Sequence, residues 1–374
     1  MSVENTPQNH ESLTEKVKAF IRPQIQALSA YHVPDSADTI KLDAMENPYQ
    51  WPDDLTEQWL DVIRNVELNR YPDPGARVLK QHLRESMDVP DGAEIILGNG
   101  SDELIQMIMM AVAGKDTVGE SHSVLSVEPG FVMYKMIATF MDMPYIGVPL
   151  KEDFSINEID LLSAIKEHQP AVIFLAYPNN PTSNLFEEQT IRNVIDAAPG
   201  VVVLDEAYHA FAEKSFMPML NEYDNLLVMR TVSKMGLAGL RLGLLAGKAE
   251  WLNEFDKVRL PYNINILTQA SAEFAIKNRH VLDQQTQQIC VDRENLYKKL
   301  SQIKNITAYP SQANFILVRV PDGQADLIFN RLKEQGILIK NLNPADGLLK
   351  NCLRITVGTS EENKCFLELF KTAL

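Results

Sequence analysis

Between Glu94 and about Leu245, short apolar runs alternate with stretches whose apolar residues recur at helical spacing. The apolar runs are continuous, as expected of strands that are buried on both faces. They occupy residues 95–97, 171–176, 201–204 and 226–229, and the helical stretches occupy residues 103–113, 160–167 and 187–198. This alternation predicts an α/β domain whose mostly parallel sheet is flanked by helices. Because ligands of such sheets bind beyond the carboxyl ends of the strands, the residues that follow each run are candidates for a site.

The sequence before this region predicts an N-terminal arm. An amphipathic helix is expected over residues 12–28, opened by a capping box at Ser12 and Glu15 and interrupted near Pro23. We therefore assign residues 1–45 to the arm and residues 46–255 to a large α/β domain.

The sequence after Trp251 predicts a second, smaller domain. A long helical region reaches Lys299, and the elements that follow mix strands and one helix. We expect strands at 314–320, 336–340 and 353–357 and a helix at 326–335. A chain of 374 residues is long enough for two domains, so residues 256–374 are expected to form a small α+β domain.

Charge and cysteine content limit the functions that the chain can have. A net charge of −15 argues against nucleic acid or an anionic membrane as a partner, since both need a basic surface. No apolar run approaches the roughly 18 residues of a membrane span, and the polar N-terminus lacks the apolar core of a signal peptide. Cys290, Cys352 and Cys365 show no metal-binding spacing, which favours reduced thiols. We expect a cytoplasmic protein without a metal.

A lysine and an arginine follow the last apolar run of the α/β region. Burial and a neighbouring cation lower the pKa of an amine, so Lys234 would be able to attack an aldehyde and form a Schiff base. Arg241 has a planar set of donors that suits a phosphate. Together they indicate pyridoxal 5'-phosphate (PLP), which carries both an aldehyde and a phosphate. The alternative, from these residues alone, is a strand-end loop with two solvated cations.

A second phosphate signal lies after the first apolar run, in the segment Gly98-Asn99-Gly100-Ser101-Asp102-Glu103. A helix is predicted to start here, and the free N–H groups and positive dipole end of a helix start bind anions. The alternative is that Ser101 or Asp102 is an ordinary N-cap.

Three other strand ends carry residues that suit the rest of this cofactor. Asn180 would donate to a phenolic oxygen, although an Asn-Pro turn is the alternative. Asp205 follows a buried run, where a carboxylate needs a cation such as a pyridinium nitrogen, and Tyr208 would reach the phenolic oxygen. A structural salt bridge is the alternative for Asp205. Phe131 would stack on a flat ring, unless it is a core phenylalanine.

The order of these motifs resembles that of the fold-type I aminotransferases that use PLP, and more closely that of the histidinol-phosphate aminotransferases of the class II family. The resemblance covers nearly the whole chain. It rests on Leu28-Ser29-Ala30-Tyr31, Asn69-Arg70-Tyr71-Pro72, Asn180-Pro181-Thr182, Asp205-Glu206-Ala207-Tyr208, Thr231-Val232-Ser233-Lys234 and Leu353-Arg354-Ile355-Thr356-Val357-Gly358. It implies the fold of aspartate aminotransferase, with a large PLP-binding domain and a small C-terminal domain.

The resemblance also implies a role for each matching residue. Lys234 would form the Schiff base, with Asp205 and Tyr208 as the other catalytic residues. The cofactor phosphate would be bound by Gly100, Ser101, Asp102, Thr231, Ser233 and Arg241, and the ring by Phe131, Asn180, Asp205 and Tyr208. Tyr71 would reach the phosphate in the neighbouring subunit of a homodimer. The substrate would be bound by Tyr31, Asn47, Lys340 and Arg354.

The chain departs from the family pattern at three places. Met45 stands where an asparagine is usual, so a polar contact is absent. The interval from Lys234 to Arg241 is one residue shorter than usual, which affects the aim of Arg241. Lys340 replaces an arginine found in many members, and it keeps the charge without bidentate binding. Residues 119–123 look like an insertion and are expected to form a surface loop.

The implied activity is transamination between L-histidinol phosphate and 2-oxoglutarate, which yields imidazole acetol phosphate and glutamate, in histidine biosynthesis. The alternatives with the same cofactor are an aminotransferase for aromatic or acidic amino acids and a PLP-dependent decarboxylase. An alternative of another class is a non-catalytic binding or regulatory module that keeps the fold. The retained Lys234 favours an enzyme.

Overall fold

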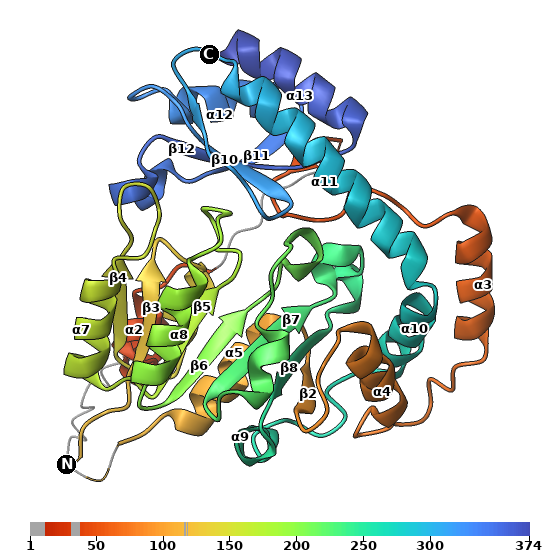
Figure 1. The fold of residues 1–374 in the computed structure, drawn as a ribbon, viewed down its shortest axis with the longest axis vertical. Coiled ribbons are helices and arrows are strands. Elements are labelled where there is room, and N and C mark those ends of the chain that lie inside the picture. The colour runs from red at the N-terminus through yellow and green to blue at the C-terminus, as the bar shows by residue number, and fades with distance from the viewer. Residues whose placement is uncertain (1–11, 31–37, 116, 118) are drawn as a thin grey trace, which may run out of the picture.

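The computed structural model describes residues 12–30, 38–115, 117 and 119–374. It contains a seven-stranded and a five-stranded sheet. Figure 1 shows the two sheets in two bodies, with the long helix α11 (Arg279–Ser301) running from one body to the other. The predicted capping box is confirmed, because Ser12 and Glu15 cap α1 (Leu13–Phe20) reciprocally, and the predicted interruption separates α1 from α2 (Pro23–Gln26).

The seven-stranded sheet confirms the predicted α/β fold. Its strand order is β2 (Glu94–Gly98), β8 (Gly243–Gly247), β7 (Leu226–Thr231), β6 (Val201–Asp205), β5 (Val172–Ala176), β3 (Val124–Glu128) and β4 (Tyr145–Pro149). The strands from β7 to β4 pair in parallel, whereas β8 is antiparallel to both of its neighbours. The carboxyl ends of β5, β6 and β7 therefore meet at one edge of the sheet.

The sheet is buried because its strands carry apolar residues on both faces. In β6, Val202 and Leu204 belong to one core cluster, and Val201 and Val203 belong to the cluster on the opposite face. This alternation follows from the two-residue period of a strand. Besides α2, which packs on α6, the helices of this body are α3 (Asp53–Arg64), α4 (Arg77–Ser86), α5 (Ser101–Val112), α6 (Val132–Phe140), α7 (Glu158–His168), α8 (Glu188–Ala197), α9 (Ala249–Asp256) and α10 (Ile266–Lys277).

The five-stranded sheet forms the second body with the C-terminal helices. Its order is β1 (Ile40–Leu42), β11 (Ile337–Asn341), β12 (Cys352–Thr356), β10 (Phe315–Arg319) and β9 (Thr307–Ala308), and its helices are α12 (Ala325–Glu334) and α13 (Ser360–Ala373). Strand β1 pairs with β11 in parallel. The segment predicted as an N-terminal arm thus contributes a strand to the sheet of the C-terminal region.

The position of helix α10 differs from the predicted division into domains. Helix α10 lies within the range assigned to the small domain, yet it packs on α3 and α4 of the other body. The domain limits at residues 45 and 255 remain predictions.

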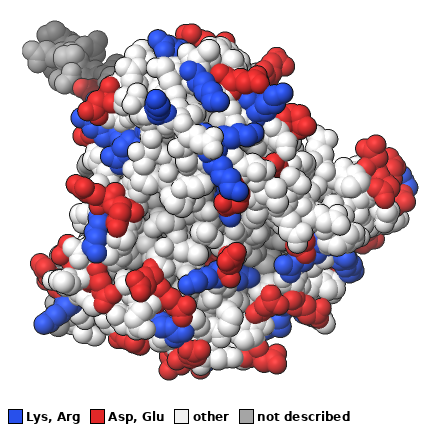
Figure 2. Space-filling view, turned by 45° about the horizontal axis from the view of Figure 1, so that its top comes forward, with Lys and Arg blue, Asp and Glu red and all other residues white. Residues whose placement is uncertain are grey.

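Among the described residues, no helix has the length and apolar character needed to cross a membrane. Figure 2 shows acidic and basic side chains interspersed over the face turned to the viewer.

Candidate active site

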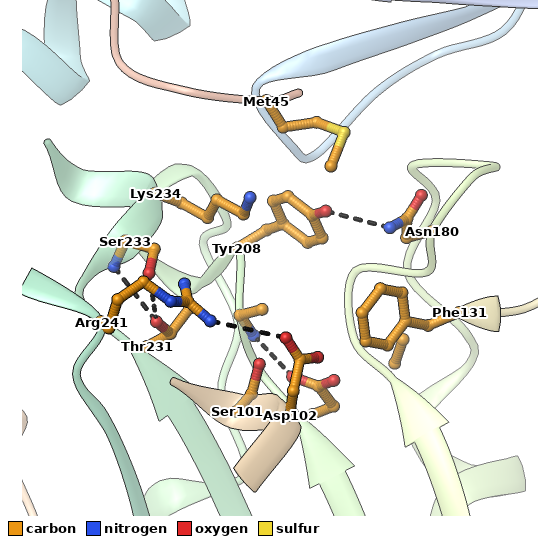
Figure 3. Close-up of a pocket in the computed structure, with 13 residues that line it drawn as sticks. Met45, Ser101, Asp102, Phe131, Asn180, Tyr208, Thr231, Ser233, Lys234 and Arg241 are labelled. Carbon is orange, nitrogen blue, oxygen red and sulfur yellow. Dashed lines mark hydrogen bonds and ion pairs between the residues drawn. The ribbon is translucent and has the colours of Figure 1, made fainter. Parts of the chain in front are cut away.

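A pocket lies at the carboxyl ends of β5, β6 and β7, between the two bodies of the molecule. Figure 3 shows Lys234 and Arg241 on one side of it, Phe131 and Asn180 on the other, and Met45 above Tyr208. The lining residues are Met45, Ser101, Asp102, Phe131, Ala176, Asn180, Asp205, Ala207, Tyr208, Thr231, Ser233, Lys234 and Arg241. Most of the residues predicted to bind the cofactor are therefore brought together in one place.

Lys234 enters the pocket from a short 3-10 helix, Ser233–Met235, directly after the buried strand β7. Its Nζ donates to the backbone oxygen of Ala44 at 3.3 Å and lies 5.9 Å from the centre of the Tyr208 ring. Burial, with a smaller contribution from the nearby Arg354 charge, lowers the pKa of the Lys234 amine to about 8. Roughly a tenth of the amine is then neutral at pH 7 and about half at pH 8, and the neutral form can act as a nucleophile or a base.

Asp205 ends strand β6 and is almost completely buried. Its Oδ2 accepts the hydroxyl proton of Tyr134 at 2.8 Å, and its Oδ1 accepts the N–H of Ala207 at 3.1 Å. Burial raises the pKa of this carboxyl to about 6. No basic side chain forms an ion pair with Asp205 within the described part of the chain, so the alternative of a structural salt bridge is wrong. That ion pair belongs to the next residue, Glu206, whose Oε2 lies 2.8 Å from Nη2 of Arg230.

A chain of hydrogen bonds connects the small sheet to the pocket. Arg354 of β12 donates from Nη1 to Oδ1 of Asn180 at 2.7 Å and from Nη2 to the backbone oxygen of Asp43 at 2.8 Å. Asn180 in turn donates from Nδ2 to the hydroxyl of Tyr208 at 3.1 Å. Burial raises the pKa of the Tyr208 hydroxyl, so this group stays protonated and can still donate to a ligand oxygen.

The start of α5 has the features of an anion site. The N-cap residue is Gly100, with φ +79°, and no side chain in the described part of the chain caps the helix, so the alternative of an ordinary cap by Ser101 or Asp102 is wrong. Nη2 of Arg241 lies 3.5 Å from Oδ2 of Asp102, and a Cβ at Gly100 would lie only 2.6 Å from that Nη2. The guanidinium therefore crosses directly over the start of the helix despite the shortened interval after Lys234.

Two hydroxyl groups lie beside this candidate anion site. Thr231 ends β7, and its Oγ1 donates to Oγ of Ser233 at 2.9 Å and accepts the backbone N–H of Ser233 at 3.2 Å. Both residues line the pocket beside Arg241. Hydroxyls, a helix start and a guanidinium are the donors that recur in phosphate sites.

Phe131 and Met45 bound the pocket with apolar surface. Phe131 immediately precedes α6, and its ring contacts that of Tyr134 edge to face with centres 5.5 Å apart. Met45 has φ +54°, a conformation that asparagine adopts more readily than methionine. Its N–H donates to Oγ1 of Thr356 at 3.0 Å, and its carbonyl accepts from Nδ2 of Asn314 at 2.9 Å. The backbone of Met45 is thus fixed while its side chain faces the pocket.

Three other residues predicted to belong to the site, Asn47, Lys340 and Tyr71, do not line the pocket. Asn47 donates from Nδ2 to the backbone oxygen of Met235, the residue after Lys234, at 3.0 Å. Lys340 lies directly opposite Arg354 in the β11–β12 pair, so both side chains share one face of the small sheet. Tyr31 lies outside the described residues.

Sequence reasoning missed two contacts of the central side chains. Tyr134 lies three residues after Phe131, about one helical turn, which would have placed it on the same side of a helix had α6 been predicted. The carbonyl of Ala44 is a backbone group, and no side-chain pattern points to it. The predicted insertion at 119–123 is a largely exposed loop before β3.

The model of the family "Aminotransferase class I and II" matches residues 37–370. Histidinol-phosphate aminotransferase 2 from Nitrosococcus oceani is 55% identical over 357 residues, which cover 96% of this chain and 98% of that protein. Among solved structures, histidinol-phosphate aminotransferase from Sinorhizobium meliloti in complex with pyridoxal-5'-phosphate has a TM-score of 0.82 at 23% identity, covering 95% and 99% of the two chains.

L-threonine-O-3-phosphate decarboxylase from Porphyromonas gingivalis has a TM-score of 0.74 at 22% identity, covering 89% of this chain and 98% of that one. Two different chemistries therefore occur on the same fold, and the fold alone does not select between them. The sequence identity to the relatives, unlike the fold, assigns the chain to a family. The chain belongs to the class I and II aminotransferases and, within them, to the histidinol-phosphate aminotransferases.

Proposed function

We propose that this protein transfers an amino group between L-histidinol phosphate and 2-oxoglutarate, and in the reverse direction between glutamate and imidazole acetol phosphate, with PLP as its cofactor. The composition of the pocket supports this function. The pocket combines a lysine amine of lowered pKa with a buried carboxylate that no cation pairs within the described residues. The 55% identity to a histidinol-phosphate aminotransferase supports the choice of substrates.

The residues of the pocket fit PLP. No cationic side chain of the described residues pairs with the buried Asp205, and a protonated pyridine nitrogen would supply a positive charge there. The uncapped start of α5, with Arg241 and the hydroxyls of Thr231 and Ser233, would hold the phosphate. When bound, PLP supplies an aldehyde that a lysine amine can hold and a ring that accepts electrons from the substrate Cα.

The protein's own residues would then manage protons and charge. The Lys234 amine would move a proton between the substrate Cα and C4′ of the cofactor, because its pKa of about 8 lets it both accept and release a proton near neutral pH. The carbonyl of Ala44 orients this amine. Asp205 holds a proton on the ring nitrogen, and Tyr208 with Asn180 donates to the phenolic oxygen.

The two substrates would share one cationic site. Arg354 and its neighbour Lys340 lie on the same face of the small sheet, and Arg354 contacts Asn180 of the pocket. Guanidinium and ammonium groups bind a carboxylate or a phosphate, so they can receive glutamate in one half-reaction and histidinol phosphate in the other. Asn47 and Tyr31 complete the proposed substrate site.

We also propose that the working unit is a homodimer located in the cytoplasm. Tyr71 is 81% exposed and stacks on Tyr262 with ring centres 4.4 Å apart. Leu68 and Leu260, close to these tyrosines in the sequence, are also more than 70% exposed. Exposed apolar side chains of this size are typical of a surface that a partner covers. A cytoplasmic location agrees with the three cysteines being free thiols.

A panel of amine substrates on the PLP-loaded protein tests the function. We expect rapid transfer from histidinol phosphate to 2-oxoglutarate, and a visible absorption band that shifts with glutamate and is missing in Lys234→Ala. Robust turnover of phenylalanine or aspartate, with no turnover of histidinol phosphate, would show that the substrates are aromatic or acidic amino acids instead. Release of carbon dioxide would favour the decarboxylase. A protein that stays colourless after PLP addition would overturn the enzymatic proposal.

A further inference from the structure

Asp205 receives its only side-chain hydrogen bond among the described residues from Tyr134. The hydroxyl of Tyr134 donates to Oδ2 at 2.8 Å, while Oδ1 accepts a backbone N–H. Tyr134 is 1% exposed, and its ring stacks on Phe174 of β5 with centres 4.8 Å apart. The rotation of the tyrosine is thus fixed by packing, and the hydroxyl is aimed at the carboxylate.

The hydroxyl of Tyr134 is a permanent donor. Burial and the neighbouring Asp205 carboxylate raise its pKa well above the usual value, so it does not ionise in the working range of pH. A donor to a carboxylate stabilises the ionised form. It opposes burial and the negative charges of Asp102 and Glu206, which all raise the pKa of Asp205. The neighbouring Glu206 cannot donate a hydrogen bond to Asp205 in place of Tyr134, because its carboxylate accepts hydrogen bonds from Arg230.

One helix connects the two ends of the proposed ring site. Phe131 precedes α6 and lines the pocket, and Tyr134 lies in the first turn of the same helix with its ring against that of Phe131. The ring that faces the cofactor and the hydroxyl that orients Asp205 therefore move together. A shift of α6 would disturb both contacts at once.

We propose that Tyr134 is a positioning residue, which keeps Asp205 ionised and aimed at the cofactor ring nitrogen. The inference rests on the proposed function, because it assumes that PLP binds in this pocket. Tyr134 itself need not touch the cofactor. Its effect is transmitted through the Oδ2 hydrogen bond, so it must vanish when Asp205 no longer carries a charge.

The test compares Tyr134→Phe with Tyr177→Phe. Tyr177 is equally buried, at 1%, packs in the core cluster on the opposite face of the sheet, and has a hydroxyl without a hydrogen-bond partner in the described part of the protein. The same atom is removed in both variants. PLP labelled with nitrogen-15 in the ring reports protonation of the ring nitrogen by NMR, and titration of the cofactor-free protein with PLP gives the affinity.

We expect Tyr134→Phe to lower PLP affinity on the order of tenfold to hundredfold and to shift the nitrogen-15 signal toward the unprotonated form. Tyr177→Phe should match the wild type in both. In the Asp205→Asn background, Tyr134→Phe should have no further effect. The inference would be overturned if Tyr134→Phe gave the same nitrogen-15 signal as the wild type. It would also be overturned if Tyr134→Phe lowered PLP affinity as much in the Asp205→Asn background as in the wild type. Failure of the wild type to bind PLP would instead overturn the proposed function. Thermal unfolding of each variant separates a loss of folding from these effects.

Discussion

A buried carboxylate such as that of Asp205 destabilises a folded chain at neutral pH unless a cation lies beside it. Its pKa is raised from 3.8 to about 6 in the folded protein. The folded state therefore binds more protons than the unfolded state between about pH 4 and pH 6, and stability falls as pH rises through this window. At pH 7 the difference corresponds to about 3 kcal/mol, as an order of magnitude.

We predict that Asp205→Asn stabilises the cofactor-free protein at pH 7 by up to about 3 kcal/mol while it weakens PLP binding. Asparagine fits the same space and can satisfy Tyr134 and Ala207, because a tyrosine hydroxyl also accepts. The gain should shrink below about pH 6 and disappear near pH 4. Urea unfolding of both cofactor-free proteins across this range measures it. A less stable variant at pH 7 would contradict the prediction.

Lys340 gives a prediction about substrate choice, also at the level of one residue. If its amine contacts the substrate phosphate, Lys340→Ala should raise KM for histidinol phosphate by roughly tenfold and leave KM for glutamate nearly unchanged. Lys371→Ala, at an exposed position of α13, is the control for a lost surface charge. Equal effects on both substrates, or none, would remove Lys340 from the phosphate site.

At the scale of secondary-structure elements, the start of α5 depends on a glycine. Gly100 combines φ +79° with ψ 178°, a region that only glycine adopts without strain of about 1–3 kcal/mol. A Cβ there would also lie 2.6 Å from Nη2 of Arg241. Any other residue must move either the helix start or the guanidinium, and both belong to the proposed phosphate site.

We predict that Gly100→Ala weakens binding of PLP much more than binding of pyridoxal, which lacks the phosphate. Gly239→Ala is the matched control, because a Cβ at Gly239 meets nothing within 4 Å. Titration of the cofactor-free proteins with both compounds measures the difference. A similar loss for PLP and pyridoxal would mean that the substitution acts through folding rather than through the phosphate.

The elements also show where sequence reasoning succeeds. The strands found from sequence, such as β5 and β6, are continuous apolar runs, because both of their faces are covered. Strands β3 and β4 were missed, since β3 contains Ser126 and Glu128 and β4 contains Gly147 and Pro149. Motif order predicted that Lys234 and the candidate phosphate-binding residues belong to one site, and most of them line one pocket. The bond from Tyr134 to Asp205 joins two elements far apart in the chain, and no local pattern encodes it.

On the scale of the whole molecule, the pocket is assembled from distant parts of the chain. The segment just after β1 supplies the carbonyls of Asp43 and Ala44, which bind Arg354 and Lys234. The backbone of Met45 is bound by residues of the small body. Movement of one body relative to the other would therefore change the contact of Lys234 with the Ala44 carbonyl and that of Arg354 with Asn180. The proposed dimer adds a further part, because Tyr71 does not line the pocket of its own subunit.

Mixing of Lys234→Ala with Tyr71→Ala, each of which we expect to be inactive alone, tests whether each site uses both subunits. Lys234→Ala lacks the amine, and Tyr71→Ala lacks the exposed tyrosine without disturbing the core. In a twofold dimer, a mixed pair places both defects in one site and leaves the other site intact. Random reassembly of equal amounts should then restore about a quarter of wild-type activity, since half of the dimers are mixed and each has one working site. Sedimentation verifies that dimers form. A mixture no more active than the average of its two components would show that Tyr71 acts within its own subunit or not at all.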